Sequence, residues 1–293
     1  MAAGTRHPPG RQKILADGVK RGDDALHRAI FAMNSGRPVE AQQLAEEILK
    51  RDSRHARASH ILGCALLVQN RPQDAIAPLE AAARGRNDPE LDIYLATALR
   101  QTGRHEEAVS RLKRTTKRWP TNAPAIHELG YALASLGRYD EAIETFRRGL
   151  EVAPMMPLLS IHLGEALLER RKYAEARSAF ANALGIVPGS SEALLGKGKA
   201  DQELGNSREA AEYFRRYLAS SPDDAVVWGR FGQCLLELGQ LETGYDCFRQ
   251  AARTHYEIAL GSLVRARRGR FWLKPSEALR FLNAKKKMNI SQK

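Results

Sequence analysis

The feature that most constrains this chain is a sequence repeat with a period of 34 residues. The pair Leu129-Gly130 returns 34 residues later as Leu163-Gly164 and again, further on, as Phe231-Gly232. A fixed period of this length indicates one small structural unit that buries its apolar face only by stacking on its neighbours. Alignment on this period gives seven repeats, whose first residues are Gly22, Ala56, Pro89, Ala123, Pro157, Ser191 and Ala225.

Each repeat is predicted to be a helical hairpin. Positions are numbered here from the first residue of each repeat. In the fourth repeat Ile126, Leu129 and Leu133 share one face of a first helix, and Ala142 and Phe146 share one face of a second. A left-handed turn between the two helices is indicated by a glycine in five repeats: Gly36, Gly103, Gly137, Gly205 and Gly239.

Two positions of the repeat hold only small residues, which lets the helix backbones approach closely. Position 8 is Ala29, Gly63, Ala96, Gly130, Gly164, Gly198 and Gly232. Position 20 is Ala41, Ala75, Ala108, Ala142, Ala176, Ala210 and Gly244.

These seven units resemble the tetratricopeptide repeat (TPR) family over about residues 22–258, including a closing proline at Pro120, Pro154, Pro188 and Pro222. The resemblance implies an all-α, right-handed solenoid of seven hairpins. We expect residues 1–21 to form a basic, mobile segment and residues 259–293 to supply a basic C-terminal cap and tail. The cap is predicted as an amphipathic helix, because a solenoid must cover its last apolar face.

No sequence signature of an enzyme is present. The chain lacks a GxxxxGK[ST] phosphate loop, a GxSxG nucleophile elbow and a GxGxxG turn. His60 and Cys64 lie one helical turn apart, but two ligands without a third do not make a metal motif. We therefore predict no catalytic residues, no metal and no cofactor.

By resemblance to TPR proteins, positions 2, 5, 9, 12 and 13 of the first helices line a concave groove that binds partner peptides. The Lys/Asn carboxylate clamp of chaperone-binding TPRs is absent, and so is the position-6 asparagine ladder of the O-GlcNAc transferase solenoid. The candidate groove residues are Arg57, His60, Arg100, His127, Tyr131, Glu165, Glu169, Lys199, Glu203, Gln233 and Glu237.

The candidate groove has an uneven distribution of charge. Glu169, Glu203 and Glu237 recur at position 13, which predicts a row of carboxylates, although a charged row is also typical of ordinary solvated surface. The N-terminal half offers Arg57, Arg100 and two histidines instead. If both halves contribute, the groove is electrically polarised and would orient a ligand.

The sixth repeat breaks the apolar pattern. It carries Lys197 and Asp201 where the third to fifth repeats carry pairs of leucines. Two readings remain open: a tolerated, partly solvated ion pair, which we favour because a lysine stem can extend out of a helix interface, or a soft joint in the solenoid.

The net charge of +12 lies entirely in the two ends of the chain, because residues 24–252 are neutral. A basic C-terminal segment with interleaved aromatic residues can bind nucleic acid or an anionic membrane surface. The favoured alternative is a cap whose bases are merely solvated. The basic tail comprises Arg265, Arg267, Arg268, Arg270, Lys285, Lys286 and Lys287.

The sequence predicts a cytoplasmic, non-catalytic scaffold or adaptor that binds a protein or peptide in its groove. No apolar run is long enough to span a membrane, the N-terminus lacks a signal-peptide core, and three scattered cysteines favour a reducing compartment. The excess of arginine over lysine and the frequent alanine favour a GC-rich bacterial coding background. The alternative function is nucleic-acid or anionic-surface binding through the basic terminal segments.

Overall fold

A computed structural model describes residues 24–255 and residue 258 of the chain. Throughout this part of the chain the secondary structure is helical, with no strand, as the repeat predicts. Residues 24–34 are helical. The helices that follow are α2 (Pro38–Arg51), α3 (Ala56–Val68), α4 (Pro72–Ala83), α5 (Pro89–Gln101), α6 (His105–Arg118), α7 (Ala123–Ser135), α8 (Tyr139–Val152), α9 (Pro157–Glu169), α10 (Tyr173–Ile186), α11 (Ser191–Glu203), α12 (Ser207–Ser220), α13 (Ala225–Glu237) and α14 (Leu241–Thr254).

The predicted repeat boundaries are confirmed at six of the seven repeats, because α3, α5, α7, α9, α11 and α13 each begin at the predicted first residue. The local reason is a capping residue just before the helix. The side chains of Asp88, Asn122, Ser190 and Asp224 each accept a hydrogen bond from a backbone N–H of the first turn. The predicted seventh start, Gly22, lies outside the described residues.

The turn inside each hairpin has the same left-handed residue at position 15. The five predicted glycines all have a positive φ, for example 73° at Gly137. In the other two repeats the same position holds Asn70, with φ 57°, and Arg171, with φ 56°. A non-glycine side chain is strained in this region, so the geometry of the turn is imposed by the packing of the two helices.

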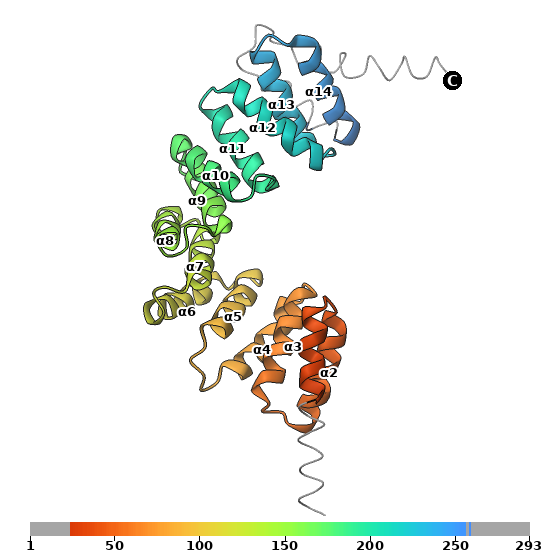
Figure 1. The fold of residues 1–293 in the computed structure, drawn as a ribbon, viewed down its shortest axis with the longest axis vertical. Helices are drawn as coiled ribbons and strands as arrows, with labels where there is room; N and C mark the ends of the chain where they lie inside the picture. Colours follow the sequence, from red (N-terminus) through yellow and green to blue (C-terminus); the bar gives the residue numbers. More distant parts are fainter. Residues whose placement is uncertain (1–23, 256–257, 259–293) are drawn as a thin grey trace, which may run out of the picture. The chain divides into compact units, whose positions relative to one another are not determined.

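The chain divides into two compact units, residues 1–141 and 142–293, and the division falls inside α8 (Figure 1). In the first unit each helix from α2 to α7 packs on the next, and in the second unit the same holds from α9 to α14. First helices of successive repeats also pack on each other, as α3 does on α5 and α9 does on α11. This is the packing that a stack of hairpins requires.

In the second, fifth, sixth and seventh repeats a glycine at position 8 faces a large residue at position 24 of the same hairpin. A Cβ atom added to Gly164 would lie 2.7 Å from the ring of Phe180, and one added to Gly198 would lie 2.7 Å from the ring of Phe214. Position 20 is equally closed, because its alanines are fully buried throughout the described repeats. The predicted close approach of the two helices is therefore confirmed.

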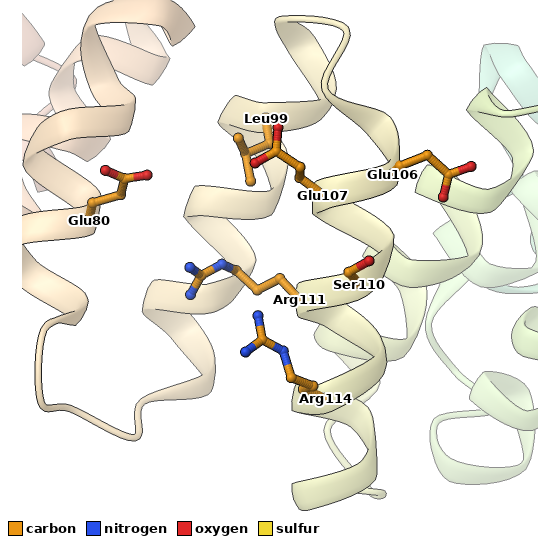
Figure 2. Close-up of a pocket in the computed structure, with 7 residues that line it drawn as sticks. All are labelled: Glu80, Leu99, Glu106, Glu107, Ser110, Arg111 and Arg114. Carbon is orange, nitrogen blue, oxygen red and sulfur yellow. The ribbon is translucent and has the colours of Figure 1, made fainter.

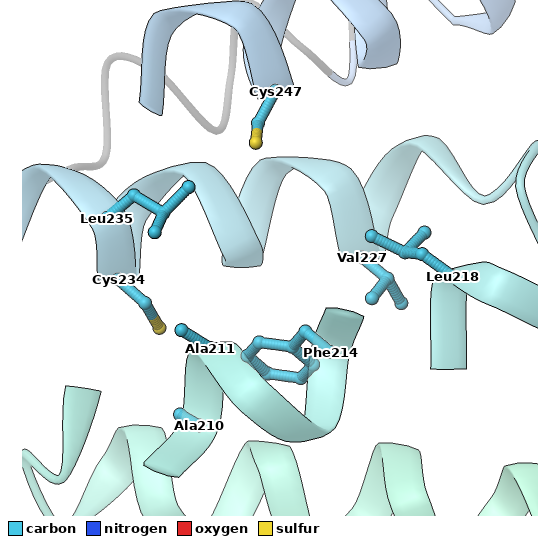
Figure 3. Close-up of a cluster of buried hydrophobic side chains, with 8 residues drawn as sticks. All are labelled: Ala210, Ala211, Phe214, Leu218, Val227, Cys234, Leu235 and Cys247. Carbon is cyan, nitrogen blue, oxygen red and sulfur yellow. The ribbon is translucent and has the colours of Figure 1, made fainter. Parts of the chain in front are cut away.

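Positions 3 and 10 of the first helix are also buried in the second to seventh repeats, which the sequence pattern did not predict. Figure 3 shows the reason in the second unit, where Val227 at position 3 and Cys234 at position 10 face α12 of the preceding repeat around Phe214. These positions touch the preceding hairpin, so their burial follows from stacking. Phe31, at position 10 of the first repeat, is 65% exposed, and no described repeat precedes it.

Lys197 and Asp201 form an ion pair, as expected, with 3.4 Å between Lys197 Nζ and Asp201 Oδ2. The expectation of partial solvation is wrong for Asp201, whose side chain is only 1% exposed. Asn206 donates a hydrogen bond to its other oxygen at 3.2 Å, and Arg177 of the preceding repeat lies 3.7 Å away. The position tolerates a carboxylate because three donors surround it.

The predicted C-terminal capping helix, together with residues 1–21 and 259–293, falls outside the described residues. None of the described helices combines the length and the apolar content that a membrane span requires.

Candidate partner-binding face

A cavity of about 300 Å³ opens on the predicted groove face in the first two repeats. Three of its residues, Arg57, His60 and Cys64, occupy positions 2, 5 and 9 of α3, as the resemblance implied for a groove. The lining is mainly apolar. We call this cavity the His60 pocket; it is lined by Ile30, Met33, Asn34, Arg57, His60, Ile61 and Cys64.

His60 carries the polar chemistry of this pocket. Its Nε2 atom is buried and has no hydrogen-bond partner, and its ring lies 5.4 Å from that of Tyr94 in a tilted arrangement. Burial lowers the pKa of His60, so the imidazole is neutral at pH 7. A buried polar atom without a partner is unfavourable by about 1–3 kcal/mol.

Cys64 contributes an apolar surface and not a reactive thiolate, because burial raises its pKa to about 12. Within residues 24–255 no group of three or more His, Cys, Asp or Glu side chains is arranged to hold a metal ion. His60 and Cys64 are therefore described as part of an apolar pocket.

Further along the same unit, four side chains from α5 and α7 form a compact cluster. Arg100 Nε donates to Glu128 Oε1 at 3.0 Å, and the two side chains are only 15% and 10% exposed. The Arg100 guanidinium also lies 4.2 Å from the centre of the Tyr131 ring. The ring of His127 stacks against the ring of Tyr131, with 6.4 Å between the two ring centroids.

This cluster corrects the expected positive charge of the N-terminal half. Arg100 is neutralised by Glu128, which position 6 contributes and which was not a predicted groove residue. The pKa of His127 is lowered to about 4, first by burial and then by the charge of Arg100, so it is neutral at pH 7. Of the predicted bases in this half, Arg57 is the exposed cation.

The link between position 12 of one repeat and position 6 of the next recurs in the second unit. Arg230 Nη1 donates to Gln202 Oε1 at 2.8 Å, and Gln202 Nε2 donates to Gln233 Oε1 at 3.3 Å. Gln233 is therefore part of an inter-repeat network. The sequence contains an indication of these links, because Arg100 at position 12 and Glu128 at position 6 of the next repeat carry opposite charges. The indication is visible only when position 12 of each repeat is compared with position 6 of the repeat that follows.

The four predicted carboxylates are exposed: Glu165, Glu169, Glu203 and Glu237. They do not form an uninterrupted acidic row, because a lysine and a serine hydroxyl interact with them. Glu237 accepts a hydrogen bond from the hydroxyl of Ser207, whereas Glu203 is exposed at the end of α11. Lys199 is half-buried, and its pKa is lowered first by burial and then by the charge of Arg230. The charges of Glu165 and Glu169 act on Lys199 in the opposite direction, so these three groups are electrostatically coupled.

The basic tail from Arg265 to Lys287 lies outside the described residues, and the alternative of nucleic-acid or anionic-surface binding stays a prediction.

Comparison with known proteins agrees with the repeat architecture. A tetratricopeptide repeat family model matches residues 28–91, 94–154, 127–191 and 195–253, which together make up more than half of the chain. No protein of curated function matches the sequence significantly.

Similar solved structures include a tetratricopeptide repeat protein from Parabacteroides merdae ATCC 43184, with 17% identity, a TM-score of 0.61, and coverage of 84% of this chain and 99% of that one. Another is PilF of Pseudomonas aeruginosa, with 18% identity, a TM-score of 0.60, and coverage of 69% and 93%. YrrB, described as a TPR protein with an unusual peptide-binding site, has 22% identity, a TM-score of 0.51, and coverage of 63% and 96%. These likenesses show the fold. The family match, the 34-residue register and the hairpin geometry together establish that the chain belongs to the tetratricopeptide repeat family.

Proposed function

We propose that this protein is a non-catalytic interaction scaffold that binds a partner peptide along the first-helix face of its N-terminal repeats, with one apolar side chain of the peptide in the His60 pocket. The TPR family is generally a protein-interaction fold. The observation that carries the proposal is the coincidence of an apolar cavity with positions 2, 5 and 9 of α3. YrrB, a TPR protein described as binding a peptide, supports this class of ligand.

The pocket selects for a particular kind of side chain. Its volume of about 300 Å³ is sufficient for a leucine, methionine or phenylalanine side chain, whose burial contributes roughly 1.5–3 kcal/mol. The exposed Arg57 at the rim favours an acidic residue beside the anchor.

The Arg100 cluster is a second contact on the same face. Because Glu128 holds the guanidinium of Arg100 over the Tyr131 ring, this surface is planar, rigid and close to neutral. Such a surface binds apolar or aromatic groups without a large loss of side-chain entropy. In the second unit we propose that Glu169 and Glu203 contact basic residues of the partner.

A peptide library displayed on phage and selected against the full-length protein tests the proposal. The selected peptide, made synthetically, is expected to bind Cys64→Phe at least about tenfold more weakly than wild type, because the added ring fills the pocket. Ser178→Phe is the matched control: it adds the same bulk to the exposed surface of α10, where Ser178 hydrogen-bonds only to a carbonyl of its own helix.

Circular dichroism melts of both variants establish that they are folded. Equal affinity of the peptide for wild type and Cys64→Phe would overturn the pocket as the binding site. The contribution of Glu169 and Glu203 is measured separately with a double Gln variant, which should lose affinity only for peptides that contain lysine or arginine.

A further inference from the structure

A second cavity, of about 370 Å³, lies away from the first-helix face, between the α4–α5 connection and α6. Four of the residues that line it are arginines. We call it the arginine pocket; its relevant residues are Arg86, Asp92, Arg111, Arg114, Arg118 and Trp119.

The charges in this pocket do not balance. Asp92 is the one carboxylate among the lining residues, and it is already satisfied by Arg111 Nη1 at 2.7 Å and by the hydroxyl of Thr115 at 2.9 Å. Arg86, Arg114 and Arg118 are exposed and line the same cavity. Three guanidinium groups gathered without an acidic partner repel one another and form a strongly positive local potential.

Of the four arginines that line the pocket, Arg111 and Arg118 are held in place. The Asp92 bridge fixes Arg111 against α5, and the Arg118 guanidinium lies 5.1 Å from the centre of the Trp119 ring. Figure 2 shows Arg111 and Arg114 leaving α6 on the same side, whereas Glu106 points away from them. Guanidinium groups held in this way match the oxygen atoms of a phosphate in bidentate geometry.

The arginine cluster is not a feature of the repeat itself. Arg111, Arg114 and Arg118 occupy positions 23, 26 and 30 of the third repeat, which are second-helix positions. The same three positions in the fourth repeat hold Thr145, Arg148 and Val152, and in the fifth they hold Ala179, Asn182 and Ile186. No other repeat carries arginine at all three positions. The bridge to Asp92 accounts for Arg111, whereas among the described residues no such bridge is formed by Arg114 or Arg118.

The neighbouring surface restricts the kind of anion. A cavity of about 280 Å³ shares Arg111 and Arg114 with the arginine pocket, but it is also lined by Glu80 and Glu107 (Figure 2). Glu107 accepts two hydrogen bonds from Arg104, each at 2.7 Å, so Glu80 is the carboxylate of this pair that is left for a ligand. Both carboxylates would repel the continuous backbone of a nucleic acid, and Glu80 would attract a cationic side chain that lies close to a compact anion.

We propose that the arginine pocket binds a phosphomonoester on a partner protein, a phosphoserine or phosphothreonine, and that the adjoining Glu80 receives a basic residue of the same segment. The bound phosphate is a dianion that the guanidinium groups of Arg86, Arg114 and Arg118 neutralise. The site shares no lining residue with the His60 pocket, and it makes recognition dependent on the phosphorylation state of the partner.

Fluorescence anisotropy with the full-length protein tests this proposal. The probe is a short labelled peptide of glycine and serine that carries one phosphoserine followed, a few residues later, by one lysine. Matched probes lack the phosphate, carry glutamate in place of the phosphoserine, or lack the lysine. Inorganic phosphate as a competitor shows whether a free anion suffices, and a labelled single-stranded oligonucleotide represents the nucleic-acid alternative.

The phosphopeptide is expected to bind at least about tenfold more tightly than the unphosphorylated and glutamate peptides, and the double variant Arg114→Gln/Arg118→Gln is expected to abolish this difference. The control is Arg148→Gln, which removes an exposed arginine from the same position in the next repeat and should leave binding unchanged. Cys64→Phe should also leave it unchanged.

Equal binding of the phosphorylated and unphosphorylated peptides would overturn the proposal. So would phosphopeptide affinity that survives in the double variant, or an oligonucleotide that binds more tightly than the phosphopeptide. Weaker binding of the probe without lysine supports the role of Glu80, and unchanged binding would overturn that part.

Discussion

In the fifth repeat, the absence of a Cβ atom at position 8 allows the two helices of the hairpin to pack. A Cβ added to Gly164 meets the Phe180 ring at 2.7 Å, and that ring is fully buried. We expect Gly164→Ala to destabilise the protein by about 1–3 kcal/mol, because the ring has no free space into which it can shift. Denaturant unfolding followed by circular dichroism measures the loss.

Gly185→Ala is the matched control in the second helix of the same hairpin. A Cβ at Gly185 meets no atom within 4 Å, so alanine should be neutral or stabilise the helix by up to about 1 kcal/mol. The interpretation of position 8 fails if both alanine variants unfold at the same denaturant concentration as wild type.

His127 makes stability depend on pH. In the folded protein its pKa is about 4, whereas in the unfolded chain it is near the ordinary value of 6.5. Between these values the unfolded state binds more protons, so the free energy of unfolding falls as the pH is lowered from about 6.5 to 4, by at most about 1.4 kcal/mol per pH unit.

The prediction is tested by comparing wild type with His127→Gln across this range. The carboxylates titrate in both proteins, so the difference between the two stability profiles isolates the histidine. Wild type should lose stability faster than the variant as the pH falls from about 6.5 to 4. Parallel profiles would contradict the lowered pKa of His127.

At the scale of the helix, α11 of the sixth repeat carries the ion pair of Lys197 and Asp201 where the third to fifth repeats carry leucines. Substitution can test what this pair contributes to stability. Asp201→Ala should destabilise by about 3–5 kcal/mol, because it leaves the ammonium of Lys197 in a site that is only 13% exposed without its carboxylate partner. Lys197→Leu/Asp201→Leu restores the leucines found at these positions in the third to fifth repeats. The double variant should recover most of the loss.

Urea unfolding of the single and double variants measures both values. If the double variant has as low a free energy of unfolding as Asp201→Ala, then two leucines cannot substitute for the ion pair at this site. It would then favour the second reading of this site, in which α11 is a soft joint.

The sequence predicted the elements well because their determinants lie within one repeat. The start of α7 at Ala123 follows from the Asn122 cap, and its contact with the second helix follows from small residues at fixed positions. The charged interior of the candidate face was not predicted. The burial of Glu128 depends on Arg100 in the preceding repeat, and no pattern within a single repeat contains that partner.

The His60 pocket could be predicted from the sequence only in part. Its α3 residues were predicted from the resemblance, but its other wall, with Ile30 and Met33, comes from the first repeat. The arginine pocket was missed for a related reason. Its residues are spread over the α4–α5 connection and α6, and a groove defined by first-helix positions does not include them.

At the scale of the whole molecule, a stack of hairpins should respond to damage locally. Each repeat contacts only its neighbours, so stability is close to a sum of local terms. We expect Gly164→Ala to accelerate hydrogen exchange in α9, α10 and α11, because Gly196 of α11 also packs on Phe180. Exchange in α3 to α5 should stay as in wild type, measured by mass spectrometry of peptic peptides. Faster exchange throughout residues 24–255 would show that the chain unfolds as one cooperative block.

The pairing of position 8 with position 24 bears on how such a chain can grow by gene duplication. Both members of the pair, as in Gly198 and Phe214, are encoded within one period, so a copied repeat brings its own complementary surface with it. Asp201 behaves differently, because Arg177, one of its three partners, belongs to the repeat before it. A recombination event that transplanted the sixth repeat alone would keep Lys197 and Asn206 beside Asp201 but would lose Arg177. One that carried the fifth and sixth repeats together would keep all three, so the complete set of partners of this carboxylate is inherited only as two periods.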